Sequence, residues 1–207
     1  MLIKKMLDLQ LQLNNSTNGE IWLDGKTKDG REINWNMCIY MEAVEALDSF
    51  NWKHWKDIDS SDDMDNIKVE IIDIWHFVMS EAIFQKEIDF LTQLKIGDAG
   101  FDRKKLIKSL EKLVSIASNY ENIKIATTEF FKILSYAGMS INDLYKNYLV
   151  KNILNKFRQD NGYKNGTYIK NWDGVEDNVV AFGIVEKQTS ISPDELYKEL
   201  NDYYKTL

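Results

Sequence analysis

Residues 70–77, Glu70-Ile71-Ile72-Asp73-Ile74-Trp75-His76-Phe77, place two carboxylates three positions apart within a run of apolar side chains. Side chains three positions apart share one face of an α-helix, so a helix here would point both acids the same way. Residues 42–45, Glu42-Ala43-Val44-Glu45, repeat the arrangement in a second stretch with helical apolar spacing. The sequence therefore predicts two helices that each present a pair of acids.

Acids set among core residues need a counter-charge. Four carboxylates brought together repel by up to roughly 4 kcal/mol per pair at 4 Å, for an effective dielectric constant near 20. Basic residues are sparse around both pairs, and ligand sets made only of oxygen favour Mg²⁺ or Mn²⁺. We therefore predict a site for Mg²⁺, with Mn²⁺ as the alternative ion, made by Glu42, Glu45, Glu70 and Asp73. The competing interpretation is that both pairs lie on solvated helix faces.

Composition limits the class of protein. A chain of 207 residues that is 44% hydrophobic can bury one sizeable core. The net charge of −7 argues against a general affinity for nucleic acid, because binding to a phosphate backbone needs a basic face. The lone Cys38 excludes an intrachain disulfide framework, and it is expected to be a small core residue rather than a nucleophile. We find no long apolar run and no signal peptide, so we expect no membrane partner and a cytoplasmic location.

Helical apolar spacing recurs along most of the chain. Residues 192–195 form a capping box with proline at the first helical position, Gly138 suits a helix C-terminus, and Asp65 or Asn66 can cap the helix that bears the second acid pair. With one proline and no convincing strand, we predict an all-α helical bundle in a single domain, residues 1–207. The expected helices span residues 2–14, 35–50, 65–94, 103–118, 122–137, 140–159, 176–187 and 193–205.

Three further groups of residues are candidates for binding. Gln10 and Asn14 lie four apart on one helix face, where two amides could pair with the edge of a base or could simply be exposed polar groups. Residues 52–56, Trp52-Lys53-His54-Trp55-Lys56, could stack a base and hold phosphate, or could be an aromatic packing plug. His76 shares the face of Asp73 and could support the site, contact a sugar or be a core histidine; a di-iron site is disfavoured because the second helix it needs is missing.

Cations and glycines gather where the helix expected at 140–159 meets a turn-rich loop. The helix carries Lys146, Lys151, Lys156 and Arg158, and residues 160–166 follow without periodicity. Arginine can fork onto phosphate oxygens and glycine lets the backbone approach, which suits a triphosphate. The alternative is that the cations complement the carbonyl end of the helix before a glycine stop.

Five blocks of this sequence, taken in order, resemble the dimeric dUTPases within the all-α nucleoside triphosphate pyrophosphatases, the MazG-like superfamily. The resemblance covers about the first 80 residues and residues 145–175, whereas residues 81–140 and the last 25 carry no motif of the family. The blocks are Leu9-Gln10 with Leu13-Asn14, Tyr40-Met41-Glu42 with Glu45, Trp52-Lys53-His54-Trp55-Lys56, residues 70–77, and Lys151-Asn152 through Phe157-Arg158-Gln159 to Asn161-Gly162-Tyr163-Lys164.

The resemblance implies a Mg²⁺-dependent dUTP diphosphatase that converts dUTP to dUMP and pyrophosphate, accepts dUDP as well, and keeps uracil out of DNA. It implies a homodimer. In the mechanism that we predict from the metal site, one glutamate orients the metal-bound water and accepts its proton, and Glu45 is our first choice for this role. The resemblance also implies that uracil and deoxyribose are selected by Gln10, Asn14, Lys53, Trp55, Lys56 and His76, and that the polyphosphate is held by Lys151, Asn155, Arg158, Tyr163 and Lys164. The alternatives are a MazG-like pyrophosphatase for dCTP or a damaged nucleotide, and a non-catalytic helical interaction module.

Overall fold

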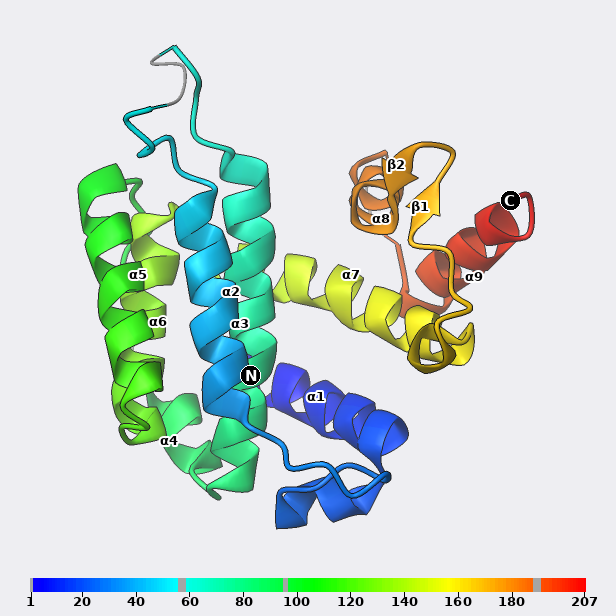
Figure 1. Ribbon diagram of the computed structural model, residues 1–207, viewed down its shortest axis with the longest axis horizontal. Helices are drawn as coiled ribbons and strands as arrows, with labels where there is room; N and C mark the ends of the chain where they lie inside the picture. The colour runs from blue at the N-terminus through cyan, green and yellow to red at the C-terminus, as the bar shows by residue number, and fades with distance from the viewer. Residues whose placement is uncertain (1, 56–58, 95–96, 188–190) are drawn as a thin grey trace. The chain divides into compact units, whose positions relative to one another are not determined.

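The computed structural model of the chain describes residues 2–55, 59–94, 97–187 and 191–207 (Figure 1). These residues form two compact units, Met1–Tyr145 and Lys146–Leu207, and each unit is described by itself. The boundary falls within one helix, α7 (Ile141–Asp160). The single domain spanning residues 1–207 stays a prediction.

The helices and connecting loops that the structure describes in the first unit form a bundle. In its core, α2 packs against α3 and α5, and α6 packs against α5 and α3 (Figure 1). Trp75 of α3 is fully buried in this bundle and stacks on Phe130 of α6, with 4.9 Å between the ring centroids. The elements of this unit are α1 (Leu2–Asn18), the 3-10 helix η1 (Glu20–Asp24), α2 (Trp35–Asp48), α3 (Met64–Phe84), α4 (Ile88–Gln93), α5 (Arg103–Ser118), α6 (Ile123–Tyr136) and the start of α7.

Hydrogen bonds at both ends fix α2 and α3 side by side in opposite directions. Asn36, in the first turn of α2, donates from Nδ2 to Glu81 Oε1 near the end of α3, at 3.2 Å. At the other end, Asn66 Nδ2 of α3 donates to Ser49 Oγ, just after α2, at 2.8 Å. This antiparallel register places the middle of α2, with its two glutamates, against the first half of α3.

The second unit has its own apolar core beneath a small hairpin. Phe157, Trp172 and Leu200 are fully buried in it. Trp172 pairs with Val175 across two short antiparallel strands, β1 and β2. The elements after α7 are the 3-10 helix η2 (Tyr163–Asn165), β1 (Asn171–Trp172), β2 (Val175–Glu176), α8 (Asp177–Glu186) and α9 (Pro193–Tyr204).

The predicted all-α class is confirmed, since the two-residue strands are a minor addition to a helical structure. Two details of the prediction are wrong. The helix expected over 65–94 is two helices, because Lys86 adopts a left-handed conformation, with φ of 60°, that ends α3 before α4 begins. The cap of α3 is Asp63, whose side chain accepts a hydrogen bond from the backbone N–H of Asn66 at 3.0 Å. No helix in the described ranges is both long and apolar enough to cross a membrane.

Candidate active site

The two predicted carboxylate pairs meet between α2 and α3. Ligand oxygens of Glu42, Glu45 and Glu70 lie within 4.8 Å of one another. Glu70 is buried, Glu42 is half-buried and Glu45 is exposed, so the group runs from the bundle interior to its surface. Asp73 follows Glu70 on the same helix face, and its charge acts on Glu42. The structure thus brings acids from both helices to one place.

The pKa of Glu42 indicates an excess of negative charge where the acids of α2 and α3 meet. Its pKa is raised from 4.5 to about 8, first by burial, then by the charge of Asp73, by a hydrogen bond with Glu70 and by the charges of Glu70 and Glu45. A carboxyl group that keeps its proton at neutral pH for these reasons would lose that proton when a cation binds beside it. The donor set is made of carboxylate oxygens, which suits a hard divalent ion such as Mg²⁺. The residues present therefore fit the predicted metal.

Cys38 lies one turn before Glu42 on α2 and is half-buried. Burial, together with the charge of Glu42, raises the pKa of its thiol to about 11. Because the thiolate is the nucleophilic form, the group is unreactive at neutral pH. This supports the prediction that Cys38 is not a nucleophile.

The predicted base-recognition residues form one buried hydrogen-bond network between α1 and α3. Gln10 Oε1 lies 2.7 Å from His76 Nδ1, and Gln10 Nε2 donates to Asn14 Oδ1 at 3.0 Å. Both amides also donate to Ser80 Oγ, from Gln10 Nε2 at 3.1 Å and from Asn14 Nδ2 at 3.0 Å. Sequence reasoning missed Ser80, although its position four residues after His76 places it on the same helix face.

A second buried acid on α3 was also missed. Glu81 accepts hydrogen bonds at Oε1 from Asn36 Nδ2 at 3.2 Å and from Gln85 Nε2 at 2.5 Å. Burial raises the pKa of Glu81 in spite of these bonds. Its contact with Asn36 belongs to the set that fixes the register of α2 against α3, so Glu81 helps to place the acid pairs.

The aromatic connection between α2 and α3 presents its rings to solvent. Trp52 and Trp55 are about half to two-thirds exposed and meet edge to face, with 5.7 Å between centroids. Lys53 forms an ion pair with Asp48. Lys56 lies outside the described residues. Exposed rings are what stacking on a base requires, so the geometry favours a binding surface over a packing plug for this block.

The ends of this connection are fastened to each other and to α5. Asp62 accepts hydrogen bonds from Arg103 Nε at 2.6 Å and Arg103 Nη2 at 2.9 Å, and from the backbone N–H of Asn51 at 2.8 Å. Arg103 Nη2 also donates to the backbone carbonyl of Asn51 at 3.3 Å. The hydrogen bond with Arg103 is the largest of the effects that lower the pKa of Asp62. Arg103 comes from the stretch without family motifs, so no sequence pattern indicated this role.

The residues predicted to hold polyphosphate lie in the second unit, on α7 and the loop after it. Lys151 is buried and donates from Nζ to Asn178 Oδ1 at 3.1 Å. Asn155 accepts a hydrogen bond from Arg158 Nη1 at 3.2 Å. Tyr163 is nearly half exposed, with the Arg158 guanidinium 5.7 Å from its ring centroid, and Lys164 is exposed.

Arg158 is joined to Asp177 by two hydrogen bonds. Its Nε and Nη2 donate to the two oxygens of Asp177, each at 2.8 Å, and both side chains are buried. Tyr168 also donates to Asp177 Oδ2 at 2.8 Å. Although burial works in the opposite direction, the guanidinium holds the pKa of Asp177 below its usual range. Sequence reasoning did not find Asp177, because it lies on a different helix from Arg158.

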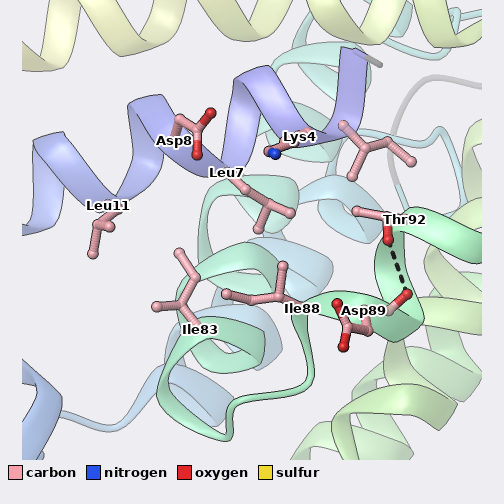
Figure 2. Close-up of a pocket in the computed structure, with 9 residues that line it drawn as sticks. Lys4, Leu7, Asp8, Leu11, Ile83, Ile88, Asp89 and Thr92 are labelled. Atoms are coloured by element: carbon pink, nitrogen blue, oxygen red, sulfur yellow. Dashed lines mark hydrogen bonds between the residues drawn. The ribbon is translucent and has the colours of Figure 1, made fainter.

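A separate cavity of about 530 Å³ lies between α1, the end of α3 and α4 (Figure 2). Its apolar lining comes from both sides, with Leu7 and Ile83 facing each other across it, while Lys4 and Asp89 bring charges of opposite sign. Of the predicted site residues that the structure describes, none lines this cavity. We therefore assign it no part in substrate binding. Its full lining is Ile3, Lys4, Leu7, Asp8, Leu11, Ile83, Ile88, Asp89 and Thr92.

A protein-family model described as dUTPase matches residues 2–163. The chain belongs to the all-α dUTPase family. It is accordingly a dUTP diphosphatase, a nucleoside triphosphate pyrophosphohydrolase, and the predicted family and enzyme class are confirmed. The match includes both acid pairs and the amide network, and it ends before Asp177. No curated protein matches the chain.

Proposed function

We propose that this dUTPase converts dUTP to dUMP and pyrophosphate with Mg²⁺ bound by Glu42, Glu45, Glu70 and Asp73. The observation that carries the proposal is the meeting of acids from α2 and α3, with oxygens of three of them within 4.8 Å and the pKa of Glu42 raised to about 8. Membership of the dUTPase family supplies the reaction. Mn²⁺ is the alternative ion, because it shares the preference for oxygen ligands.

The roles of the residues follow from where they lie. Bound Mg²⁺ would neutralise charge on the phosphates and lower the pKa of a water molecule. Glu45, the most exposed of the three clustered glutamates, is the one best able to reach that water, so we assign it the task of orienting the water and accepting its proton. Glu70 and Glu42, which are more buried, would serve mainly as ligands.

We assign substrate selection to the amide network and the aromatic block. Gln10, Asn14 and His76 are gathered at one place by hydrogen bonds, which supports a common role in reading the uracil edge. Trp55 offers an exposed ring for stacking, and Lys53 and Lys56 of the same block would contribute positive charge. In the second unit, Lys151, Asn155, Arg158, Tyr163 and Lys164 are assigned to the polyphosphate on the strength of the family resemblance.

Further features are proposed on the same basis. We propose that the enzyme also accepts dUDP, that it acts as a homodimer and that it is cytoplasmic. Light scattering of the purified chain tests the dimer directly: a monomeric mass at micromolar concentration would refute it. The rival substrates, dCTP or a damaged nucleotide, share the metal chemistry and differ only in base recognition.

The deciding experiment is pyrophosphate release from dUTP, dCTP, dTTP and UTP, each with Mg²⁺ and with a chelator, together with phosphate release from dUDP. We expect Mg²⁺-dependent release from dUTP in large excess over the others. Glu70→Gln should lower turnover by at least about 100-fold, since even outer-sphere changes at metal sites cost about 10–100-fold. Glu111→Gln, on the exposed face of α5, is the matched control and should leave turnover unchanged.

Two outcomes would contradict the proposal. Full activity in the chelator, or in Glu70→Gln with an unchanged helical spectrum, would show that the acids are not the metal site. Preferential release from dCTP would keep the metal site and remove the assignment of Gln10 and Asn14 to uracil. If no nucleotide were hydrolysed and Mg²⁺ gave no protection against thermal unfolding, the non-catalytic interaction module would be favoured.

A further inference from the structure

Ser80 is the centre of the buried network between α1 and α3. It is fully buried, and its hydroxyl contacts Gln10, Asn14 and the backbone carbonyl of His76. A hydroxyl has one proton and two acceptor lone pairs, so the direction of its single donor bond decides what its neighbours must be. The donor and acceptor roles of the other groups in the network can therefore be assigned by starting from Ser80 Oγ.

The Ser80 proton has a fixed destination. Ser80 Oγ lies 2.8 Å from the carbonyl oxygen of His76, which can only accept a hydrogen bond. The lone pairs of Ser80 Oγ are then left for the two amides, and both amides must present nitrogen to it, as Gln10 Nε2 and Asn14 Nδ2 do. The hydroxyl of Ser80 thus fixes which end of each amide is the donor.

The same argument determines which ring nitrogen of His76 carries the proton. With its nitrogen directed to Ser80, Gln10 turns its oxygen to His76 Nδ1 at 2.7 Å, and an amide oxygen can only accept. In the neutral ring, Nδ1 must therefore carry the proton. One serine consequently determines the orientation of two amides and the tautomer of one histidine.

We propose that Ser80 is a specificity-determining positioning residue, which holds Asn14 and Gln10 in the orientation that accepts uracil and rejects cytosine. Within the part of the chain that the structure describes, Asn14 has one amide N–H and one Oδ1 lone pair beyond the bonds above. Uracil presents an N3–H donor beside carbonyl acceptors, whereas cytosine presents an acceptor at N3 beside an amino donor. For a base held in one place, an amide whose nitrogen and oxygen ends are fixed can pair with only one of these two bases. An amide turned by 180° would pair with the other. This inference rests on the proposed function, because it assumes that the network reads the base.

The kinetic test compares Ser80→Ala with Ser80→Thr. Removing the hydroxyl frees both amides to reverse, so the ratio of kcat/KM for dUTP to kcat/KM for dCTP should fall by about tenfold or more, mainly through the KM values. Ser80→Thr keeps the hydroxyl and should restore the ratio. The matched control is Thr127→Val on α6, since the Thr127 hydroxyl is likewise buried and donates to a carbonyl four residues earlier, that of Ile123, at 2.8 Å. This control should leave the ratio unchanged.

A measurement on the substrate-free protein tests the same inference without activity. The chain has two histidines, so the ring nitrogens of His76 can be assigned by ¹⁵N NMR against those of His54. We expect the neutral ring of His76 in the unaltered protein to be the Nδ1–H tautomer, and Ser80→Ala to show a mixture of tautomers.

The outcomes separate this inference from the proposed function. An Nε2–H tautomer in the unaltered protein, or a Ser80→Ala variant with unchanged tautomer and unchanged substrate ratio, would overturn the role of Ser80 while dUTP hydrolysis stood. Equal loss of activity on dUTP and dCTP would show a merely structural role and also overturn it. Absence of dUTP hydrolysis by the unaltered protein would refute the proposed function and the specificity role with it, whatever the tautomer.

Discussion

Glu42 and Glu70, on two facing helices, have carboxyl oxygens that lie within 4.8 Å of each other. Burial, the charge of Asp73 and the nearness of Glu70 raise the pKa of Glu42 to about 8, so Glu42 keeps its proton at neutral pH. In the ion-free dUTPase, the proton on Glu42 reduces the repulsion between the acids of α2 and α3.

The first prediction concerns pH and the stability of the ion-free protein. The folded chain holds the Glu42 proton up to about pH 8, whereas an unfolded chain releases it near pH 4.5. The folded state binds more protons between these values, so stability should fall as pH rises through this window. After discounting for partial exposure, ~1 kcal/mol, or about 2–4 °C in Tm, is expected between pH 5 and pH 8. Thermal unfolding in chelator measures it. Glu42→Gln should abolish the decline; a decline that persists in this variant would place the proton elsewhere.

The second prediction concerns the fastening of the aromatic connection. Arg103→Ala removes both hydrogen bonds to Asp62 and the bond to the Asn51 carbonyl. Because the pair is partly exposed, stability should change by less than ~1 kcal/mol. The KM for dUTP should rise severalfold with kcat little changed, since the connection that carries Trp52 and Trp55 loses its attachment to α5. Steady-state kinetics decide the matter, with Lys104→Ala as the neighbouring control. Equal KM values for the two variants would exclude a positioning role for Arg103.

The third prediction concerns the buried ion pair of the second unit. Asp177→Asn leaves the Arg158 guanidinium buried without its counter-charge, which costs about 3–5 kcal/mol in comparable cases. Urea unfolding should show this loss. Asp202→Asn removes an exposed ion pair with Lys198 and should cost under ~0.5 kcal/mol. Similar values for the two variants would mean that Asp177 contributes no more than a surface charge.

The fourth prediction uses two glycines of the loop after α7. Both adopt left-handed backbone conformations, with φ of 88° at Gly162 and 70° at Gly166. A Cβ at Gly162 would lie 2.1 Å from Thr167 Oγ1, whereas a Cβ at Gly166 would meet no atom within 4 Å. Alanine at either site carries the conformational strain, so the difference in stability between the two variants isolates the clash. We expect Gly162→Ala to unfold at lower urea than Gly166→Ala; the reverse order would show that Thr167 moves aside at no cost.

Much of the fold could be predicted because amphipathic helices have a recognisable apolar spacing in the sequence. Apolar spacing marked α2, α5 and α6 to within a few residues, and the capping box at Ser192 is present as expected. The break after Phe84 could not be predicted, since it depends on Lys86 in a left-handed conformation where no glycine or proline stands. The strand pair could not be predicted either, because two residues on each side are too short to show alternation.

The acids of the site were predictable because each pair is local, with both members on one helix. The residues that hold the other candidate site residues in place were harder to predict, since most of their partners are distant in sequence. Ser80 could have been found from its spacing to His76, but Asp177 and Arg103 are identified only by the atoms they contact across 19 and 41 residues. Local periodicity thus reveals the candidate site residues better than the residues that hold them in place.

The link between Asn51 and Asp62 has a consequence for variation and engineering. The backbone N–H of Asn51 donates to Asp62, and Arg103 donates to Asp62 and to the backbone carbonyl of Asn51, so the two ends of the connection are joined to each other and to α5. Extending a closed loop costs little, about 0.6 kcal/mol for each doubling of its length. We therefore expect the span between these ends to accept changes of sequence or length while α2 and α3, the helices that carry the acids, keep their register.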